Sequence, residues 1–162
     1  MFFGIPVFSF VFVHTLITLV AIVAGLIMLF AMLGNRKSGG ATSIFLLFSV
    51  LTAMTGFIIQ TVPVTPAVVT GVLLSLALIP ALLARYVFGF AGAWRWIWVV
   101  TAFLSLYLNC FVLVIQSFLK VPALHALAPG APPGGSVFGA VQGVVLVFFV
   151  VSAFLALRRF RP

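Results

Sequence analysis

The stretch TAFLSLYLNCFVLVIQSFLK, residues 101–120, decides the fold that we expect for this chain. It is apolar almost throughout and long enough to cross a bilayer as a helix, which takes about 20 such residues. It also carries Thr101, Ser105, Asn109 and Gln116, which share one side of a helix. Lipid cannot satisfy hydroxyl and amide groups, so these side chains are expected to face other helices or a hydrated cavity.

The composition of the whole chain agrees with this interpretation. Of its 162 residues, 65% are hydrophobic and 5% are charged, and every charged residue is Lys or Arg. A soluble protein carries about a quarter of charged residues. We therefore predict an integral membrane protein whose surface lies against lipid.

Five stretches of the sequence are apolar and long enough to span a membrane. We predict a single all-α transmembrane domain over residues 1–162, a polytopic bundle of five helices. The predicted spans cover approximately residues 7–33, 42–61, 66–88, 96–119 and 136–157. The connections are short and rich in Gly, Pro or polar residues, except for an outer loop at 120–135.

The cations predict how the bundle is oriented. With five spans, seven of the eight cations fall on the same side of the membrane: Arg36, Lys37, Arg85, Arg95, Arg158, Arg159 and Arg161. Only Lys120 falls on the opposite side. The positive-inside rule then puts the N-terminus outside and the C-terminus in the cytoplasm. We expect these seven cations to face anionic lipid or an acidic partner surface. Trp94, Trp96, Trp98 and Tyr86 lie near the same span ends, as in an aromatic belt.

The absence of Asp and Glu argues against several kinds of chemistry. Paired-carboxylate hydrolysis, carboxylate-bound Mg²⁺ or Ca²⁺, a Ser-His-Asp triad and a carboxylate proton relay all lack their essential groups. We therefore expect no catalytic residues and no enzyme. Two His and one Cys, far apart in sequence, do not predict a metal site. The cations form no basic face with interleaved aromatics, so nucleic acid is not an expected partner.

Strongly polar side chains gather in the outer half of the predicted bundle. Spans one, two and five carry narrow faces of small or polar residues: His14, Thr18, Ala21 and Gly25; Ser49, Thr52, Ala53, Gly56 and Gln60; Gly139, Gln142 and Gly143. Such faces let helices approach closely and hydrogen-bond. Together they predict a polar cluster beneath the outer loop, with five candidate ligand-binding residues: His14, Gln60, Asn109, Gln116 and Gln142.

Two interpretations of this cluster remain open. In the first, its groups hydrogen-bond between helices and fix the bundle. In the second, they line a pocket for a quinone, haem or lipid, because amides and an imidazole can bond a carbonyl or hydroxyl group above apolar walls. Haem would need His14 as an axial ligand, with His125 in the outer loop as the other histidine. No cofactor is required by the sequence.

The strings ARYVFGFAGAWRWIWVVTA, LYLNCFVLVIQSFLKVPALHALAP and RRFRP carry a resemblance across most of the chain. In these strings the chain resembles a family of small bacterial multi-span inner-membrane proteins to which no activity is assigned. The resemblance implies the fold and a bacterial inner-membrane location, and it implies no functional residue. The leading hypothesis is a non-enzymatic accessory or structural subunit of a larger membrane complex. The alternative is a quinone, haem or lipid binder.

Overall fold

The computed structural model of the chain describes residues 7–36, 38–59 and 66–161, and these residues contain no strand. Its long helices are α1 (Val7–Leu33), α2 (Gly39–Ile59), α3 (Pro66–Leu82), α4 (Trp94–Lys120) and α6 (Gly135–Arg159). A π-turn, η1 (Leu83–Val87), prolongs α3, and a short helix, α5 (Pro122–Leu127), follows α4. All five long segments are apolar and long enough to cross a membrane, which confirms the predicted five-span α-helical bundle.

The helix ends lie within a few residues of the predicted limits. The second helix begins at Gly39 rather than at residue 42, and the fourth begins at Trp94 rather than at residue 96. The first ends where polar and glycine residues follow it, and Asn35 there has a left-handed φ of 52°. Small or short polar residues tolerate this conformation at helix ends. The outer loop differs from its prediction because it contains α5, with Pro122 at its first turn.

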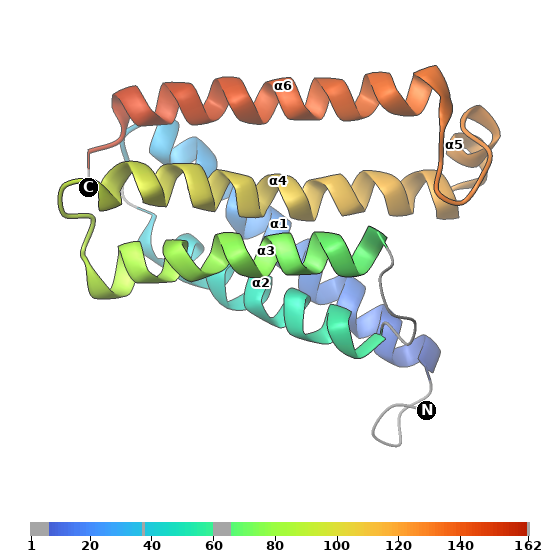
Figure 1. Cartoon of the computed structure of the whole chain (residues 1–162), viewed down its shortest axis with the longest axis horizontal. Coiled ribbons are helices and arrows are strands. Elements are labelled where there is room, and N and C mark those ends of the chain that lie inside the picture. The colour runs from blue at the N-terminus through green and yellow to red at the C-terminus, as the bar shows by residue number, and fades with distance from the viewer. Residues whose placement is uncertain (1–6, 37, 60–65, 162) are drawn as a thin grey trace.

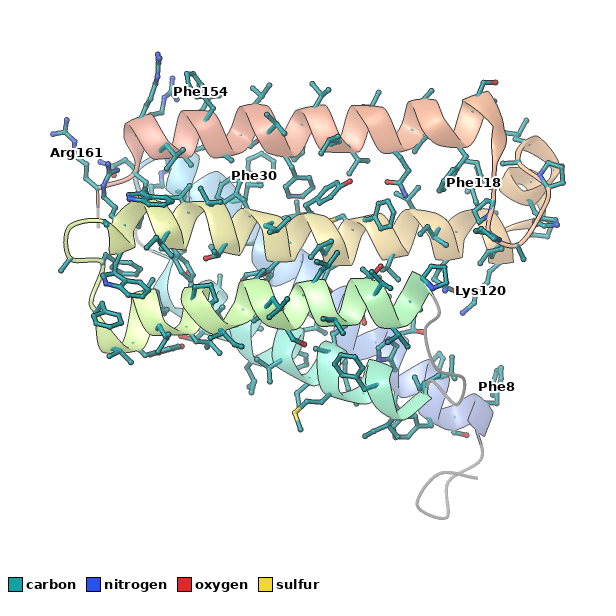
Figure 2. All side chains as sticks on the ribbon, viewed as in Figure 1. Phe8, Phe30, Phe118, Lys120, Phe154 and Arg161 are labelled. Carbon is teal, nitrogen blue, oxygen red and sulfur yellow. The ribbon has the colours of Figure 1, made fainter. Side chains whose placement is uncertain are left out.

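The two ends of the bundle differ in charge. One end, which we call the arginine-rich end, holds the described cations that lie in or next to the helix ends there: Arg36, Arg85, Arg95, Arg158, Arg159 and Arg161. Lys120 closes α4 at the opposite end, which we call the Lys120 end (Figure 2). Lys37, predicted to join the first group, lies outside the described residues. The distribution of cations along the bundle is therefore strongly one-sided.

Helix α4 lies at the centre of the bundle and contacts α1, α3, α5 and α6. The buried core clusters around its first half, where Trp98, Val99 and Leu106 are almost completely covered. The buried residues of α1 belong to its second half, and those of α2 and α3 also lie mainly toward the arginine-rich end. The tightest packing is thus concentrated in one half of the molecule.

The other half is open because α1 and α2 diverge from α3 and α4 toward the Lys120 end (Figure 1). The helices meet closely at Gly25, where an added Cβ would lie 2.5 Å from Leu106 Cδ1 and 2.8 Å from Phe45 Cδ2. Only a glycine permits this approach without movement of its neighbours. Beyond Gly25, toward the start of α1, no residue of Phe8–Val20 is buried. The four helices therefore form a V whose arms separate at the Lys120 end.

Helix α6 packs on α4 and α1 and differs from its prediction in one respect. Gly139 and Gly143 were expected to face another helix, but both are exposed, and nothing lies within 4 Å of a Cβ added at either position. The contact with α4 is instead made by larger residues, including Phe149, which meets Tyr107 edge to face. Large side chains hold α6 farther from α4 than a glycine contact would.

The aromatic belt is also only partly as expected. Trp96 and Tyr86 are exposed at the arginine-rich end, but Trp98 is 1% exposed and belongs to the core. Trp94 stacks on Phe88 with ring centroids 4.0 Å apart. Trp94 and Trp98 are four residues apart and share the helix face that meets the core, whereas Trp96 lies on the opposite, exposed face.

Candidate functional site: a cavity between α1, α2, α3 and α4

A cavity of about 360 Å³ occupies the opening of the V between α1, α2, α3 and α4. It lies at the Lys120 end, and its wall is mainly aliphatic and aromatic. Its polar wall residues come from all four helices: His14, Thr15 and Thr18; Thr52; Thr70; and Asn109, Gln116, Ser117 and Lys120. The structure therefore brings residues far apart in the sequence around one space.

Three of the five predicted site residues line this cavity, namely His14, Asn109 and Gln116. Gln142 does not. It lies on α6, donates from Nε2 to Phe111 O at 3.1 Å, and its buried Oε1 has no partner among the described residues. Because α6 packs against α4 away from α2 and α3, Gln142 cannot join the cluster. Gln60 lies outside the described residues.

The outer loop does not cover the cavity in the way that the sequence suggested. Apart from Lys120 and Val121, none of the described residues of the 120–135 loop lines it. α5 follows α4 on the side of α6 (Figure 1), and His125 Nδ1 of this helix donates to Phe118 O at 3.2 Å. Phe118 also meets Phe138 of α6 edge to face. These contacts hold the loop against α4 and α6.

His14 is tied to α2 by a short hydrogen bond. Its Nδ1 lies 2.6 Å from Thr55 Oγ1, and that hydroxyl lies 2.7 Å from Leu51 O. Two oxygens this close need a hydrogen between them, so Thr55 donates to Leu51 O and accepts from His14. A second contact joins the same helices, with Thr18 Oγ1 3.3 Å from Thr52 Oγ1. One edge of the imidazole is therefore fixed, and the ring lies in the cavity wall.

Asn109 marks the deep end of the cavity. Its side chain is 2% exposed and donates from Nδ2 to Ser49 Oγ at 3.1 Å, which joins α4 to α2. Gln116 lies about two turns nearer to the Lys120 end, and none of the described residues hydrogen-bonds its amide. Lys120 is exposed at the end of α4. The polar wall thus runs from a buried amide that bonds to α2 to Gln116 and Lys120, which can bind an occupant.

The sequence interpretation missed part of the cavity wall. Thr15, Thr70, Ser117 and Lys120 were not predicted as site residues. For Thr70 a signal existed, because Ala67, Thr70 and Gly71 follow the three- and four-residue spacing of one helical face. This small and polar face of α3 closes the cavity opposite α1 and α2.

Metal or haem coordination finds little support in this geometry. His125 is absent from the cavity wall, and both histidines use Nδ1 in hydrogen bonds to other groups. Among the described residues, no three His, Cys, Asp or Glu side chains gather closely enough to hold a metal ion. Within the described part of the cavity wall, His14 Nε2 is the one histidine nitrogen without a hydrogen-bond partner.

The cations at the arginine-rich end fall into two groups. Arg85 donates to Gly39 O at 3.1 Å, and Arg95 donates to Leu157 O and Phe160 O at 3.1 and 2.9 Å, so both tie helices together. The second group is exposed and consists of Arg36, Arg158, Arg159 and Arg161. Since the chain has no acidic side chain, this second group is the one available to an external anion.

Comparison of the chain with models of protein families, with curated proteins and with solved structures gives no match.

Proposed function

We propose that this chain is a non-enzymatic membrane protein that binds a membrane-soluble amphiphile in the cavity between α1, α2, α3 and α4. The observation that carries this proposal is the cavity itself, which joins a mainly apolar wall to a strip of polar groups facing the Lys120 end. Small-molecule sites have this same division, with few polar groups on an apolar wall.

The size of the cavity limits the occupant. Its volume of about 360 Å³ is at the lower end of the roughly 300–1,000 Å³ range of small-molecule sites. An apolar space of this size is costly to leave empty, because its lining loses packing contacts. A single-chain amphiphile or a ring with a short tail fits this volume better than a two-chain lipid. Its polar end would lie near Gln116 and Lys120, with its apolar end deeper in the V.

Further parts of the proposal concern location and neighbours. We propose a bacterial inner-membrane location, with anionic lipid at the exposed arginines, where each cation near such a surface contributes about 1 kcal/mol. An accessory role in a larger membrane complex is compatible with the cavity, since a bound amphiphile can be shared with or presented to a partner. The same measurement tests both roles.

The test is native mass analysis after mild detergent extraction, combined with solvent extraction of bound small molecules. We expect a bound amphiphile that is lost in Gly56→Leu, because a Cβ at Gly56 lies 3.5 Å from His14 Cε1 and a longer side chain would fill the cavity. Gly143→Leu is the matched control, because its Cβ meets nothing within 4 Å. A co-purifying protein would support the accessory role.

A preparation without any bound small molecule, which also fails to take one up when amphiphiles are added back, would contradict the binding proposal. Equal retention by Gly56→Leu and Gly143→Leu would also contradict it, because the occupant would then lie elsewhere on the protein.

A further inference from the structure

The hydrogen-bonding capacity of the cavity wall is unevenly divided between donors and acceptors. Every Ser and Thr hydroxyl in the wall lies within hydrogen-bond distance of the carbonyl four residues earlier in its own helix, and Thr18 and Thr52 also lie 3.3 Å from each other, so each of these hydrogens has an acceptor within the protein. The oxygen-to-oxygen distances are 2.9 Å for Thr15, 3.0 Å for Thr18, 2.8 Å for Thr52, 2.9 Å for Thr70 and 2.8 Å for Ser117. A hydroxyl has one hydrogen and two lone pairs. These five groups therefore offer lone pairs, and no hydrogen, to an occupant.

His14 adds a stronger acceptor to the same wall. Its Nδ1 donates to Thr55 Oγ1, because the Thr55 hydrogen is directed to Leu51 O. Histidine is ordinarily mostly neutral at pH 7, and the chain has no Asp or Glu side chain to stabilise an imidazolium. A neutral imidazole that carries its hydrogen on Nδ1 has a lone pair on Nε2. That nitrogen is an acceptor on a ring that lines the cavity.

Donors in the wall are few and lie mainly toward the Lys120 end. Asn109 gives one of its two Nδ2 hydrogens to Ser49 and keeps the other at the deep end of the cavity. The remaining donors in the described wall are the amide of Gln116 and the ammonium of Lys120. An occupant consequently meets acceptors from α1, α2 and α3, and donors mainly from the last turns of α4.

We infer that the occupant is an uncharged amphiphile whose polar end carries a hydroxyl group that donates to His14 Nε2. Its oxygen accepts from Gln116 or Lys120. This inference rests on the proposed function and names the class of ligand for the same cavity. A carboxylate or a phosphodiester has no hydrogen to give at neutral pH, and neither has an ether or a quinone, so none of these heads can donate to His14 Nε2. Phenols, quinols and fatty alcohols all have the required chemistry.

The test compares pairs of probes in which a methyl group replaces the hydroxyl hydrogen. 4-Octylphenol is matched with 4-octylanisole, and 1-decanol with decyl methyl ether. Each probe is radiolabelled, and binding is measured as the amount retained by nanodiscs that contain the protein relative to the amount retained by empty nanodiscs. Loss of a hydrogen bond to a buried acceptor is expected to weaken binding of each ether about tenfold. Tighter binding of the phenol than of the alcohol would identify a ring as the polar end, and the reverse would identify an alkyl alcohol.

Two variants connect the preference to His14. His14→Ala removes the acceptor, so we expect the phenol to bind as weakly as its ether. Thr55→Val leaves the wall intact, because Thr55 does not line the cavity, but removes the partner that keeps the hydrogen on Nδ1. Nε2 can then carry the hydrogen, and the preference for the phenol should fall to about twofold or less. His125→Ala is the matched control and should keep the full preference.

The outcomes separate the two proposals. Equal binding of phenol and ether by the wild-type protein overturns the hydroxyl inference and leaves an amphiphile site in place. A preference that survives unchanged in Thr55→Val also overturns it, because the hydrogen on Nδ1 would then be irrelevant. If no probe is retained above empty nanodiscs, the proposed function fails together with the inference.

Discussion

Asn109 is the most deeply buried amide in the described part of the chain, and its environment explains how an apolar bundle accommodates it. Its side chain lies among core residues of α4 and donates to Ser49, which is itself fully buried on α2. A buried amide without a partner would cost about 1–3 kcal/mol. Most other polar side chains avoid this cost by bonding to their own helix, as Thr101 does with Ile97 O. Asn109 and Ser49 therefore form a specific link between two helices.

We predict that this link contributes a measurable coupling energy. In a double-mutant cycle with Asn109→Leu and Ser49→Ala, the coupling in the free energy of unfolding should be about 0.6 kcal/mol, the average for such bonds in a bilayer. Reversible unfolding in SDS, followed by tryptophan fluorescence, gives the four free energies. Thr101→Ala and Ser49→Ala form the control pair, and their effects should add because Thr101 bonds within its own helix. Additive effects in the Asn109 cycle would mean that the bond is not formed in the membrane.

At the scale of elements, Arg95 shows how one side chain can serve two helices. It lies in the first turn of α4, where a cation is unfavourable beside the positive end of the helix dipole. Its guanidinium donates to Leu157 O and Phe160 O at the end of α6. Carbonyls at a helix end lack partners within the helix and carry negative partial charge. Arg95 thereby stabilises the last turn of α6 and attaches it to α4.

We predict that Arg95→Ala frees the end of α6. The amide of Phe160, which bonds to Ala156 O, should exchange with deuterium at least about tenfold faster, which corresponds to the loss of about 1.4 kcal/mol of local stability. Arg158→Ala is the control, because Arg158 lies over the Phe154 ring of its own helix, 4.2 Å from the centroid. Hydrogen exchange with mass spectrometry on peptides covering residues 150–161 distinguishes the two. Equal protection in both variants would mean that Arg95 does not stabilise the last turn of α6 and that contacts with lipid alone hold it in place.

The sequence predicted the elements well but their contacts poorly. Each span was recognisable because about 20 apolar residues are required to cross a bilayer, and the polar or glycine-rich connections limited the choice of ends. The faces through which the helices contact one another were harder to predict. Lipid and protein interior are both apolar, so a membrane helix is hydrophobic all round. Gly139 and Gly143 illustrate this, since their spacing suited helix packing and yet both are exposed. Likewise, Gln142 was grouped with His14 from its small and polar helix face and its depth, and it lies on α6 away from the cavity.

At the scale of the whole molecule, the two ends of the bundle have different properties. The arginine-rich end is tightly packed around Trp98, whereas the Lys120 end is splayed and holds the cavity. If the positive-inside rule governs this chain, the packed end faces the cytoplasm and the cavity lies in the outer leaflet. Any ligand would then enter from the outer leaflet or the outside. Membrane orientation consequently decides from which compartment the cavity is filled.

We predict that Lys120 is accessible from outside and Arg161 only from the cytoplasm. Lys120→Cys and Arg161→Cys, which lie at opposite ends (Figure 2), are placed separately in a Cys110→Ala background to remove the chain's free cysteine. A membrane-impermeant maleimide added to intact cells should label the first, and it should label the second only after permeabilisation. Val144→Cys is the control, because Val144 is 70% exposed within the span and should meet lipid, so neither condition labels it. Labelling of Arg161→Cys in intact cells would mean that the bundle has the opposite orientation, with the cavity in the inner leaflet.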